Sequence, residues 1–427
     1  MTGLLMLLGL VALILINVPI GVALGVVAMV VMISTHGMES LLSAAITMFS
    51  GATNFPLLAI PLFILAGAIM NSSSLSRRLI AFASAIFGCI KGGLAMVNIG
   101  TSLFFAEISG SAVADVAAMG SILIPAMKKK GYPKEFAAAV TSSSATLAVI
   151  IPPSIPMILY AVMADASVVQ IFVAGIVPGV LGGVMMMSLA YWYATRYNYP
   201  VEEVFSWKKL KDTGKEAGWA FTLPLIILGG IFGGWVTATE GAALAVLAAL
   251  FIGGVIYREL NLKHLYESML DGGIQTAVVM LLVAASALLG HLLTELQMPQ
   301  QIAAAMTSFT DNKYAVLAML NVFFLICGLF LHSAAAIILV VPIVLPLVNA
   351  VGIDPVHFGL VVTLNLGIGQ QTPPVASVLA TSCSIARADM WKVTKVNLPF
   401  IGVLFFLLMM VTYVPAIPMF LVEYFYR

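Results

Sequence analysis

Long apolar runs recur from one end of the chain to the other, separated by short polar stretches. A helix needs about 20 mostly apolar residues to cross a bilayer. The longest polar stretch lies only near residues 196–215, which leaves no room for a large soluble domain. The pattern predicts spanning segments near residues 3–33, 55–71, 134–164, 168–195, 217–235, 238–257, 274–293, 355–385 and 397–421.

Two more apolar segments, 94–128 and 314–349, are interrupted near their middle by small or polar residues. Each arm has about 16 residues, or about 24 Å of helix, so the turn would lie deep in the membrane without emerging. We therefore predict two re-entrant helical hairpins. Residues 76–90 and 298–310 are short for spans and are predicted to lie along the membrane interface, with a short tilted span as the alternative.

A set of proline, glycine and phenylalanine residues repeats in the same order and at nearly constant spacing in the two halves of the chain. Pro125, Gly131, Pro133, Phe136, Pro152-Pro153 and Pro178 are followed 221 or 222 residues later by Pro346, Gly352, Pro355, Phe358, Pro373-Pro374 and Pro399. Such repeats in transporters commonly have inverted topology. We predict an all-α integral membrane protein with a first repeat at 1–216, a linking span at 217–237 and a second repeat at 238–427.

Basic residues decide the predicted orientation, because Lys and Arg collect in cytoplasmic loops. The loop 128–134 contains four lysines, whereas its repeat mate 349–355 has no basic residue. The two loops are therefore predicted on opposite sides, which makes the repeats inverted. With a cytoplasmic N-terminus and a periplasmic C-terminus, 17 of the 19 Lys and Arg residues fall in cytoplasmic loops, leaving Lys313 and Arg427 outside.

Composition supports the membrane assignment and narrows the partners. The chain is 62% hydrophobic and only 9% charged, with a mean hydropathy of +1.10. Soluble domains carry about a quarter charged residues. The formal net charge of +1 gives no indication of a nucleic-acid partner, so lipid is the expected surroundings.

The candidate chemistry lies where helices are predicted to break at membrane depth, which is tolerated only inside protein or beside a water-filled cavity. The hairpin turns fall at residues 109–112 and 328–334, and the broken spans at Pro152-Pro153 and Pro373-Pro374. A proline pair removes amide donors and frees upstream carbonyl oxygens, which are suitable ligands for a monovalent cation. The N-terminal end of a hairpin helix suits an anionic group.

Ionisable residues near these breaks are functional candidates. Asp115 lies one helical turn after the first hairpin turn, and His332 lies in the second turn. Close packing of small residues and simple proline kinks are the structural alternatives at each break taken alone.

Absent motifs limit the reaction classes. The sequence has no phosphate-binding loop of the Gly-x-x-x-x-Gly-Lys-Ser/Thr type and no His-Glu-x-x-His or Gly-x-Ser-x-Gly element. An enzyme is not expected, and energy would come from an ion gradient.

The segments EISGSAVADVAAMGSILIPAMKKKGYPKEFAAAV, IIPPSIPMILYAV and GIGQQTPPVA resemble the large membrane subunit of the tripartite ATP-independent periplasmic (TRAP) transporters, within the ion transporter superfamily. The resemblance covers essentially the whole chain. It implies an elevator-type, sodium-driven importer of a bacterial inner membrane, with scaffold and transport domains each built from both repeats. It also implies two partners, a small four-helix membrane subunit and a periplasmic substrate-binding protein.

The resemblance also implies site residues. A first sodium site would involve Ser109, Ala148, Ile151 and Pro153, and a second Gly328, Gly369 and Thr372. Ala148 stands where the family often has glycine. The substrate would contact Ser109, Gly110, Ser111, Asp115 and His332. Sodium would be the only metal, and no other cofactor is expected. The implied substrate is a small organic acid, a sialic acid or a C4-dicarboxylate.

Other readings remain open. A stand-alone sodium–dicarboxylate symporter would need no binding protein. A membrane-embedded serine hydrolase would use Ser109 or Ser111 as nucleophile, with His332 as base. A simple channel would not give saturable uptake.

Overall fold

The computed structural model describes residues 18–73, 75–202, 204–298 and 312–426, with isolated positions before residue 18 and between 300 and 310. The side chains of residues 106–109 lie outside this description. Every regular element in the described part is a helix. Eight of these helices are long and apolar enough to cross a membrane.

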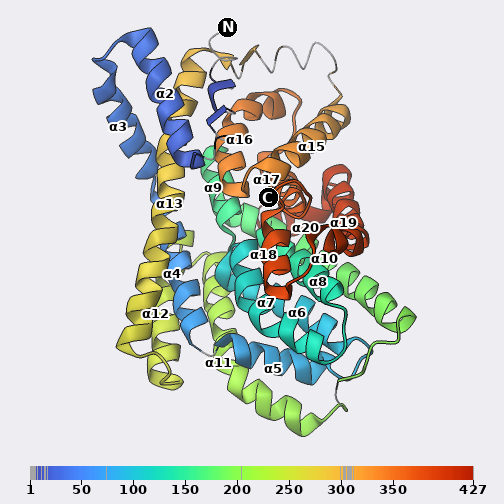
Figure 1. The fold of residues 1–427 in the computed structure, drawn as a ribbon. Helices are drawn as coiled ribbons and strands as arrows, with labels where there is room; N and C mark the ends of the chain where they lie inside the picture. Colours follow the sequence, from blue (N-terminus) through green and yellow to red (C-terminus); the bar gives the residue numbers. More distant parts are fainter. Residues whose placement is uncertain are drawn as a thin grey trace.

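One group of helices stands along the left edge of Figure 1. It consists of α2 (Ile20–His36), α3 (Ser40–Ala52), α4 (Ala59–Ser72), α12 (Ala238–Phe251) and α13 (Leu262–Glu295). The long α13 packs against α2, α3 and α4, and α12 packs against α4. A short 3₁₀ turn, η1 (Phe55–Leu58), precedes α4, and a π-helical turn, η3 (Ile252–Ile256), follows α12.

The prediction of one span at 3–33 is wrong where the chain is described. α2 begins only at Ile20, after the non-helical Val18 and Pro19. A proline has no amide donor and disfavours helical geometry in the residue before it, so the helix starts anew after Pro19. The separate helix α3, which turns back along α13, was not expected.

The first hairpin and the first broken helix follow. Their elements are α5 (Leu75–Phe87), α6 (Gly93–Ser109), α7 (Ala112–Lys129), α8 (Lys134–Thr146), η2 (Leu147–Val149) and α9 (Ile155–Met163). The hairpin arms thus lie close to the predicted 94–128. α5 runs across the lower end of the bundle in Figure 1, in the segment predicted to lie along the interface.

Two long helices, α10 (Val168–Arg196) and α11 (Trp207–Phe232), lead to the second half. There, a hairpin is formed by α15 (Lys313–Phe330) and α16 (Ser333–Ala350), and a broken helix by α17 (Pro355–Gly369) and α18 (Ser377–Ala386). Figure 1 shows this hairpin in the upper half and the first hairpin in the lower half. The segment predicted to lie flat at 298–310 falls mostly outside the described residues.

The last predicted span, 397–421, is also wrong. α19 extends from Met390 to Tyr413, and a separate helix, α20 (Ala416–Tyr426), begins after Pro415. Pro415 has no amide donor with which to continue the ladder, so the chain turns there. α20 then packs against α10.

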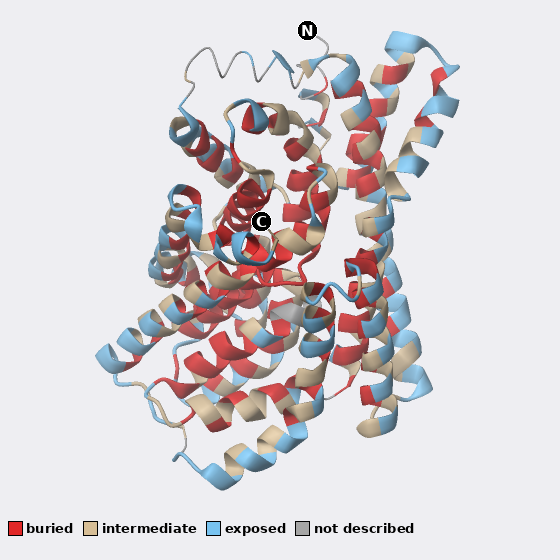
Figure 2. Ribbon diagram, turned by 180° about the vertical axis from the view of Figure 1, so that it is seen from behind, coloured by how far each residue is buried: buried red, intermediate tan, exposed pale blue. Residues whose placement is uncertain are grey.

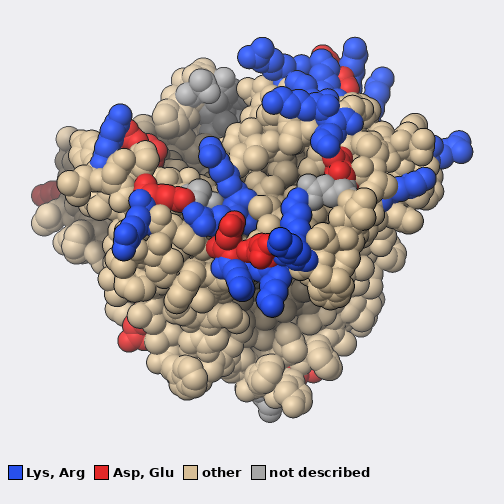
Figure 3. Space-filling view, turned by 90° about the horizontal axis from the view of Figure 1, so that it is seen from below, with Lys and Arg blue, Asp and Glu red and all other residues tan. Residues whose placement is uncertain are grey.

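The broken helices form the centre of the molecule. All residues from Phe136 to Thr146 and from Val356 to Gly369 are buried. Figure 2 shows this buried centre surrounded by partly exposed outer helices. Figure 3 shows Lys and Arg side chains gathered on the lower end of the molecule. The centre therefore holds the two helix breaks, and many of the Lys and Arg side chains lie on the lower face.

Candidate functional site

Both helix breaks have the same local design. Pro152-Pro153 and Pro373-Pro374 are both joined by cis peptide bonds. Each pair stands between two helices whose axes are interrupted, α8 and α9 in one half and α17 and α18 in the other. The repeat in the sequence therefore appears as a repeated backbone feature.

The first hairpin turn touches the first break. Gly110 has a φ of +58°, which favours glycine, and its carbonyl oxygen accepts a hydrogen bond from the Ile155 amide at 3.3 Å. A Cβ atom added to Gly110 would lie 3.2 Å from the carbonyl oxygen of Pro153. Ser109 ends α6 immediately before this turn, and its side chain lies outside the described part.

Of the ligands predicted for the first sodium site, Pro153 lies at this contact, and Ala148 and Ile151 precede it in the same break. Ala148 lies in η2, and Ile151 and Pro153 follow it; Ala148 is fully buried and Ile151 is nearly so. In the described part of the chain, no turn, loop or side-chain hydrogen bond is accepted by the carbonyl oxygens of these three residues. Such oxygens are suitable ligands for a small cation, and a Cβ at position 148 does not remove the carbonyl.

The second hairpin touches the second break even more closely. A Cβ added to Gly369 would lie 2.5 Å from the carbonyl carbon and the Cα of Gly328. The Thr372 amide donates to the Gly369 carbonyl oxygen at 3.0 Å, and the Thr372 hydroxyl donates to Ile368 at 3.2 Å. The structure thus brings together all three residues predicted for the second sodium site.

The residues predicted to contact the substrate differ in how far they are buried. Ser111 is the N-cap residue of α7 and is partly exposed, close to the turn. Asp115 lies in the first turn of α7 and is 0% exposed. Its carboxylate lies near the Ser102 hydroxyl of α6, but no hydrogen bond of ordinary geometry reaches either oxygen among the described residues. Asp115 therefore stands inside protein, behind the surface that a ligand would touch.

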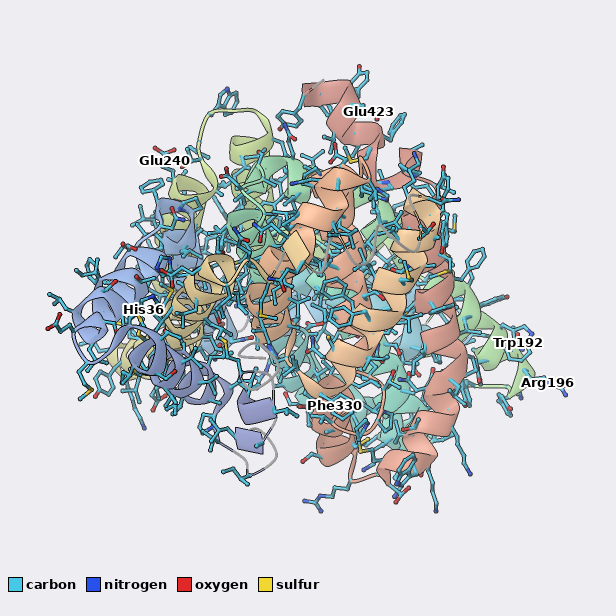
Figure 4. All side chains as sticks on the ribbon, turned by 90° about the horizontal axis from the view of Figure 1, so that it is seen from above. His36, Trp192, Arg196, Glu240, Phe330 and Glu423 are labelled. Carbon is cyan, nitrogen blue, oxygen red and sulfur yellow. The ribbon has the colours of Figure 1, made fainter. Side chains whose placement is uncertain are left out.

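His332 is the N-cap residue of α16 and is exposed. Its imidazole makes no hydrogen bond in the described part of the chain, so the residue proposed as base in the hydrolase reading activates no serine there. Phe330, just before the turn and labelled in Figure 4, is 55% exposed. The second turn is thus accessible.

The two breaks also differ in how far their residues are buried. Every residue from Leu147 to Ile155 is buried, whereas Pro374 of the second proline pair and the next residue, Val375, are exposed. The first break is closed over and the second is partly open in this conformation.

Sequence reasoning missed a pair of buried asparagines. Asn98 on α6 donates to the Thr141 hydroxyl of α8 at 2.7 Å. Asn321 on α15 accepts from Asn365 of α17 at 2.6 Å and donates to Thr412 at 3.2 Å. Each hairpin is thus bonded through an asparagine to its own broken helix. The sequence repeat could have identified this pair, since the two asparagines are 223 residues apart, close to the repeat offset.

A second missed feature joins the two broken helices. Gln371 accepts through Oε1 from Ser142 at 3.1 Å and from Asn397 at 2.9 Å, and its Nε2 donates to Thr146 at 2.5 Å. The Ser143 hydroxyl lies 2.5 Å from the Asn397 amide oxygen. All five side chains are fully buried. No local pattern marks this network, because its members come from three separate parts of the chain.

The arrangement has the chemistry of a cation and ligand site. The described residues contain no group of His, Cys, Asp or Glu that would hold a transition metal. They do contain carbonyl and hydroxyl oxygens at two breaks, each capped by a hairpin turn. Oxygen ligands of this kind suit hard cations.

The sequence profile of the tripartite ATP-independent periplasmic transporter family, DctM component, matches residues 7–417. The chain is 42% identical to the isethionate TRAP transporter permease DctMQ of Oleidesulfovibrio alaskensis over 95% of its own length and 64% of that protein. It is 38% identical to the C4-dicarboxylate TRAP transporter large permease DctM of Vibrio cholerae, covering 94% of this chain and 93% of that one. It is 36% identical to the sialic acid TRAP transporter large permease SiaM of the same species, covering 96% of each.

Among solved structures, the fold is similar to that of the YdaH transporter of Alcanivorax borkumensis. The TM-score is 0.62 at 15% identity, covering 91% of this chain and 89% of that one. That likeness concerns the fold alone. Together with the family profile and the full-length relatives, the helical fold and its paired breaks lead to one assignment: the chain belongs to the large permease subunits of TRAP transporters, a family of membrane transporters and not of enzymes.

Proposed function

We propose that this chain carries a small organic anion across a bacterial inner membrane by sodium symport, with an elevator-type movement. The observation that carries the proposal is the pairing of each hairpin turn with a proline-pair break. Gly110 meets Pro153 and Ile155 in one half, and Gly328 meets Gly369 in the other. Two oxygen-rich sites of matching design suit two coupling cations that bind together with one cargo.

Inverted repeats are part of this proposal. α12 packs on α4 as α2 packs on α13, and each hairpin is bonded by an asparagine to its broken helix. Hairpins placed in opposite halves of the molecule also favour inversion (Figure 1). Repeats 1–216 and 238–427 would each contribute to a fixed scaffold and to a moving transport domain, with 217–237 linking them.

The lower, basic end would face the cytoplasm, following the positive-inside rule. Figure 1 marks the N-terminus at the opposite, upper end, so this orientation would make it periplasmic, contrary to the cytoplasmic N-terminus predicted from the sequence. The C-terminus, marked in the upper half, would also be periplasmic. The gathering of Lys and Arg at this end supports the orientation (Figure 3).

The cargo would be an organic acid such as those named for the relatives: isethionate, a C4-dicarboxylate or a sialic acid. All carry a carboxylate or sulfonate group, which suits the N-terminal ends of α7 and α16. A small four-helix membrane subunit and a periplasmic substrate-binding protein would be the protein partners. A stand-alone sodium–dicarboxylate symporter is the alternative. It would take up substrate without the binding protein.

Uptake into proteoliposomes tests the proposal. The vesicles would contain this chain with a small membrane subunit of the TRAP family, and a TRAP substrate-binding protein would be outside. Labelled succinate, isethionate and N-acetylneuraminate would be offered with an inward gradient of sodium or of potassium. Uptake of one of the three that requires both sodium and the binding protein is expected. Equal uptake in potassium would refute sodium coupling, and uptake without the binding protein would favour the stand-alone carrier.

A further inference from the structure

A cavity of about 810 Å³ lies between the first hairpin and the left-hand group of helices. One wall is α7, and the other is formed by the end of α4, the start of α5, the turn before α13 and α13 itself. Cavities of about 300–1,000 Å³ hold small ligands in proteins. The cavity therefore has room for a small organic molecule.

The α7 wall is a stripe of small side chains. Ala114, Ala117, Ala118 and Ser121 stand at helical spacing on one face, about 10 Å in length. The stripe begins three residues after Ser111, the first residue beyond the turn at Gly110. The cavity thus extends from near the first hairpin turn toward the basic end of the molecule.

The opposite wall presents hydrogen-bond donors. Asn71 and Gln275 line it with exposed amide groups that make no hydrogen bond in the described part of the chain. Ser76 also lines it; this residue is only 6% exposed, and its hydroxyl has no hydrogen-bond partner among the described residues. A buried hydroxyl without a partner is costly, so the wall favours a ligand that accepts hydrogen bonds.

The charge of this wall is positive. Arg77 lines the cavity and is exposed, and in the described part of the chain no carboxylate lies within ion-pair distance of it. Glu259, the only acidic residue among the described lining side chains, lies 2.6 Å from the guanidinium of Arg78. The Glu259 charge is therefore compensated, and that of Arg77 is not.

We propose that this cavity is a second organic-anion site, where the cargo rests between the hairpin turn and the cytoplasm. Arg77 is its charged contact, and Ser76, Asn71 and Gln275 are neutral donors. The site takes a carboxylate or sulfonate of the size of succinate or isethionate. This inference rests on the proposed transport function for its role, whereas its affinity for anions is a property of the cavity alone.

Thiol labelling tests the site without transport. Ser121 is exposed and lines the cavity, so Ser121→Cys places a thiol there once Cys89, Cys327 and Cys383 are replaced by serine. The reaction rates of an anionic reagent, sulfonatoethyl methanethiosulfonate, and a cationic one, trimethylammonioethyl methanethiosulfonate, are compared in detergent. Arg77→Gln should lower the anionic-to-cationic rate ratio about three- to tenfold, the range expected of one exposed charge close to the thiol.

Arg196→Gln is the matched control, because Arg196 lies at the outer end of α10, away from the centre of the molecule (Figure 4). It should leave the ratio unchanged. Succinate or isethionate should also slow labelling of the introduced thiol in the chain with Arg77 and protect less in the Arg77→Gln variant. An unchanged ratio in Arg77→Gln, or an absence of protection by both anions, would overturn the second site. Failure of sodium-dependent uptake with intact protection would instead count against the transport proposal.

Discussion

The side-chain amide nitrogen of Gln371 lies 2.5 Å from the hydroxyl oxygen of Thr146, although the residues are 225 positions apart. Thr146 ends α8 just before the first break, and Gln371 precedes the second proline pair by two residues. The two halves of the molecule are thus joined directly between their candidate cation sites.

Replacement of Gln371 should therefore affect both sites. Gln371→Ala leaves the buried partners Ser142, Thr146 and Asn397 without these hydrogen bonds, at about 1–3 kcal/mol for each group left unsatisfied. We expect a lower thermal midpoint in detergent and a weaker stabilisation by sodium relative to potassium. The neighbouring Gln370→Ala is the control, since the side chain of Gln370 makes two long contacts of 3.5 Å. Equal effects of the two substitutions would contradict the linking role.

Gly369→Ala tests the close approach of the second hairpin. Its new methyl group would lie 2.5 Å from backbone atoms of Gly328, which cannot move aside as a side-chain end can. We expect sodium-dependent uptake to fall at least tenfold, since the geometry of a binding site must hold within about 0.5 Å.

Gly402→Ala is the matched control for that substitution, because a Cβ there meets no atom within 4 Å. Within α19 it should keep uptake and raise the free energy of unfolding by up to about 1 kcal/mol. A Gly369→Ala variant with normal uptake would show that the contact of the hairpin with the break is not needed.

Substitution of Asp115 should affect the stability of the protein and its transport activity differently. An unpaired carboxylate in the protein interior destabilises the fold, and the amide of Asp115→Asn has nearly the same shape without the charge. We expect the thermal midpoint to stay or rise, while uptake falls at least tenfold, since an ionisable group kept at this depth serves transport. Asp212→Asn on exposed α11 is the control. A lower midpoint with unchanged uptake would assign Asp115 a structural role only.

Lys128 and Lys134 stabilise the C-terminal end of α18. Their ammonium groups donate to the carbonyl oxygens of Ala386 and Arg387, at 3.0 and 3.1 Å. Cations at a helix C-terminus contribute about 0.3–1 kcal/mol each. Lys128→Met should therefore lower the thermal midpoint by about 1 °C. Lys129→Met, which removes an exposed lysine next to it, should not, and equal shifts would argue against the cap.

Many helix ends could be predicted from the sequence because single glycine and proline residues interrupt a helix by local backbone geometry. Gly110 supplies a positive φ at the first turn, and proline pairs interrupt the ladder wherever they stand. The hairpin arms and broken helices accordingly begin and end near the expected positions. Pro19 and Pro415 interrupt the helical ladder in the same way, and for this reason the predicted spans 3–33 and 397–421 are longer than the helices α2 and α19.

The membrane class, the helix breaks and the repeat register were determined by the sequence itself, since hydrophobicity, proline geometry and spacing need no partner. Only the tertiary structure decided which distant residues meet: Gln371 with Thr146, Asn321 with Asn365, and Arg77 with a cavity beside α7. It also buried the imidazole of His357, which lies 2.8 Å from the carbonyl oxygen of Val411, 54 residues away. These contacts depend on how helices far apart in the chain pack together, and no local pattern of residues specifies that.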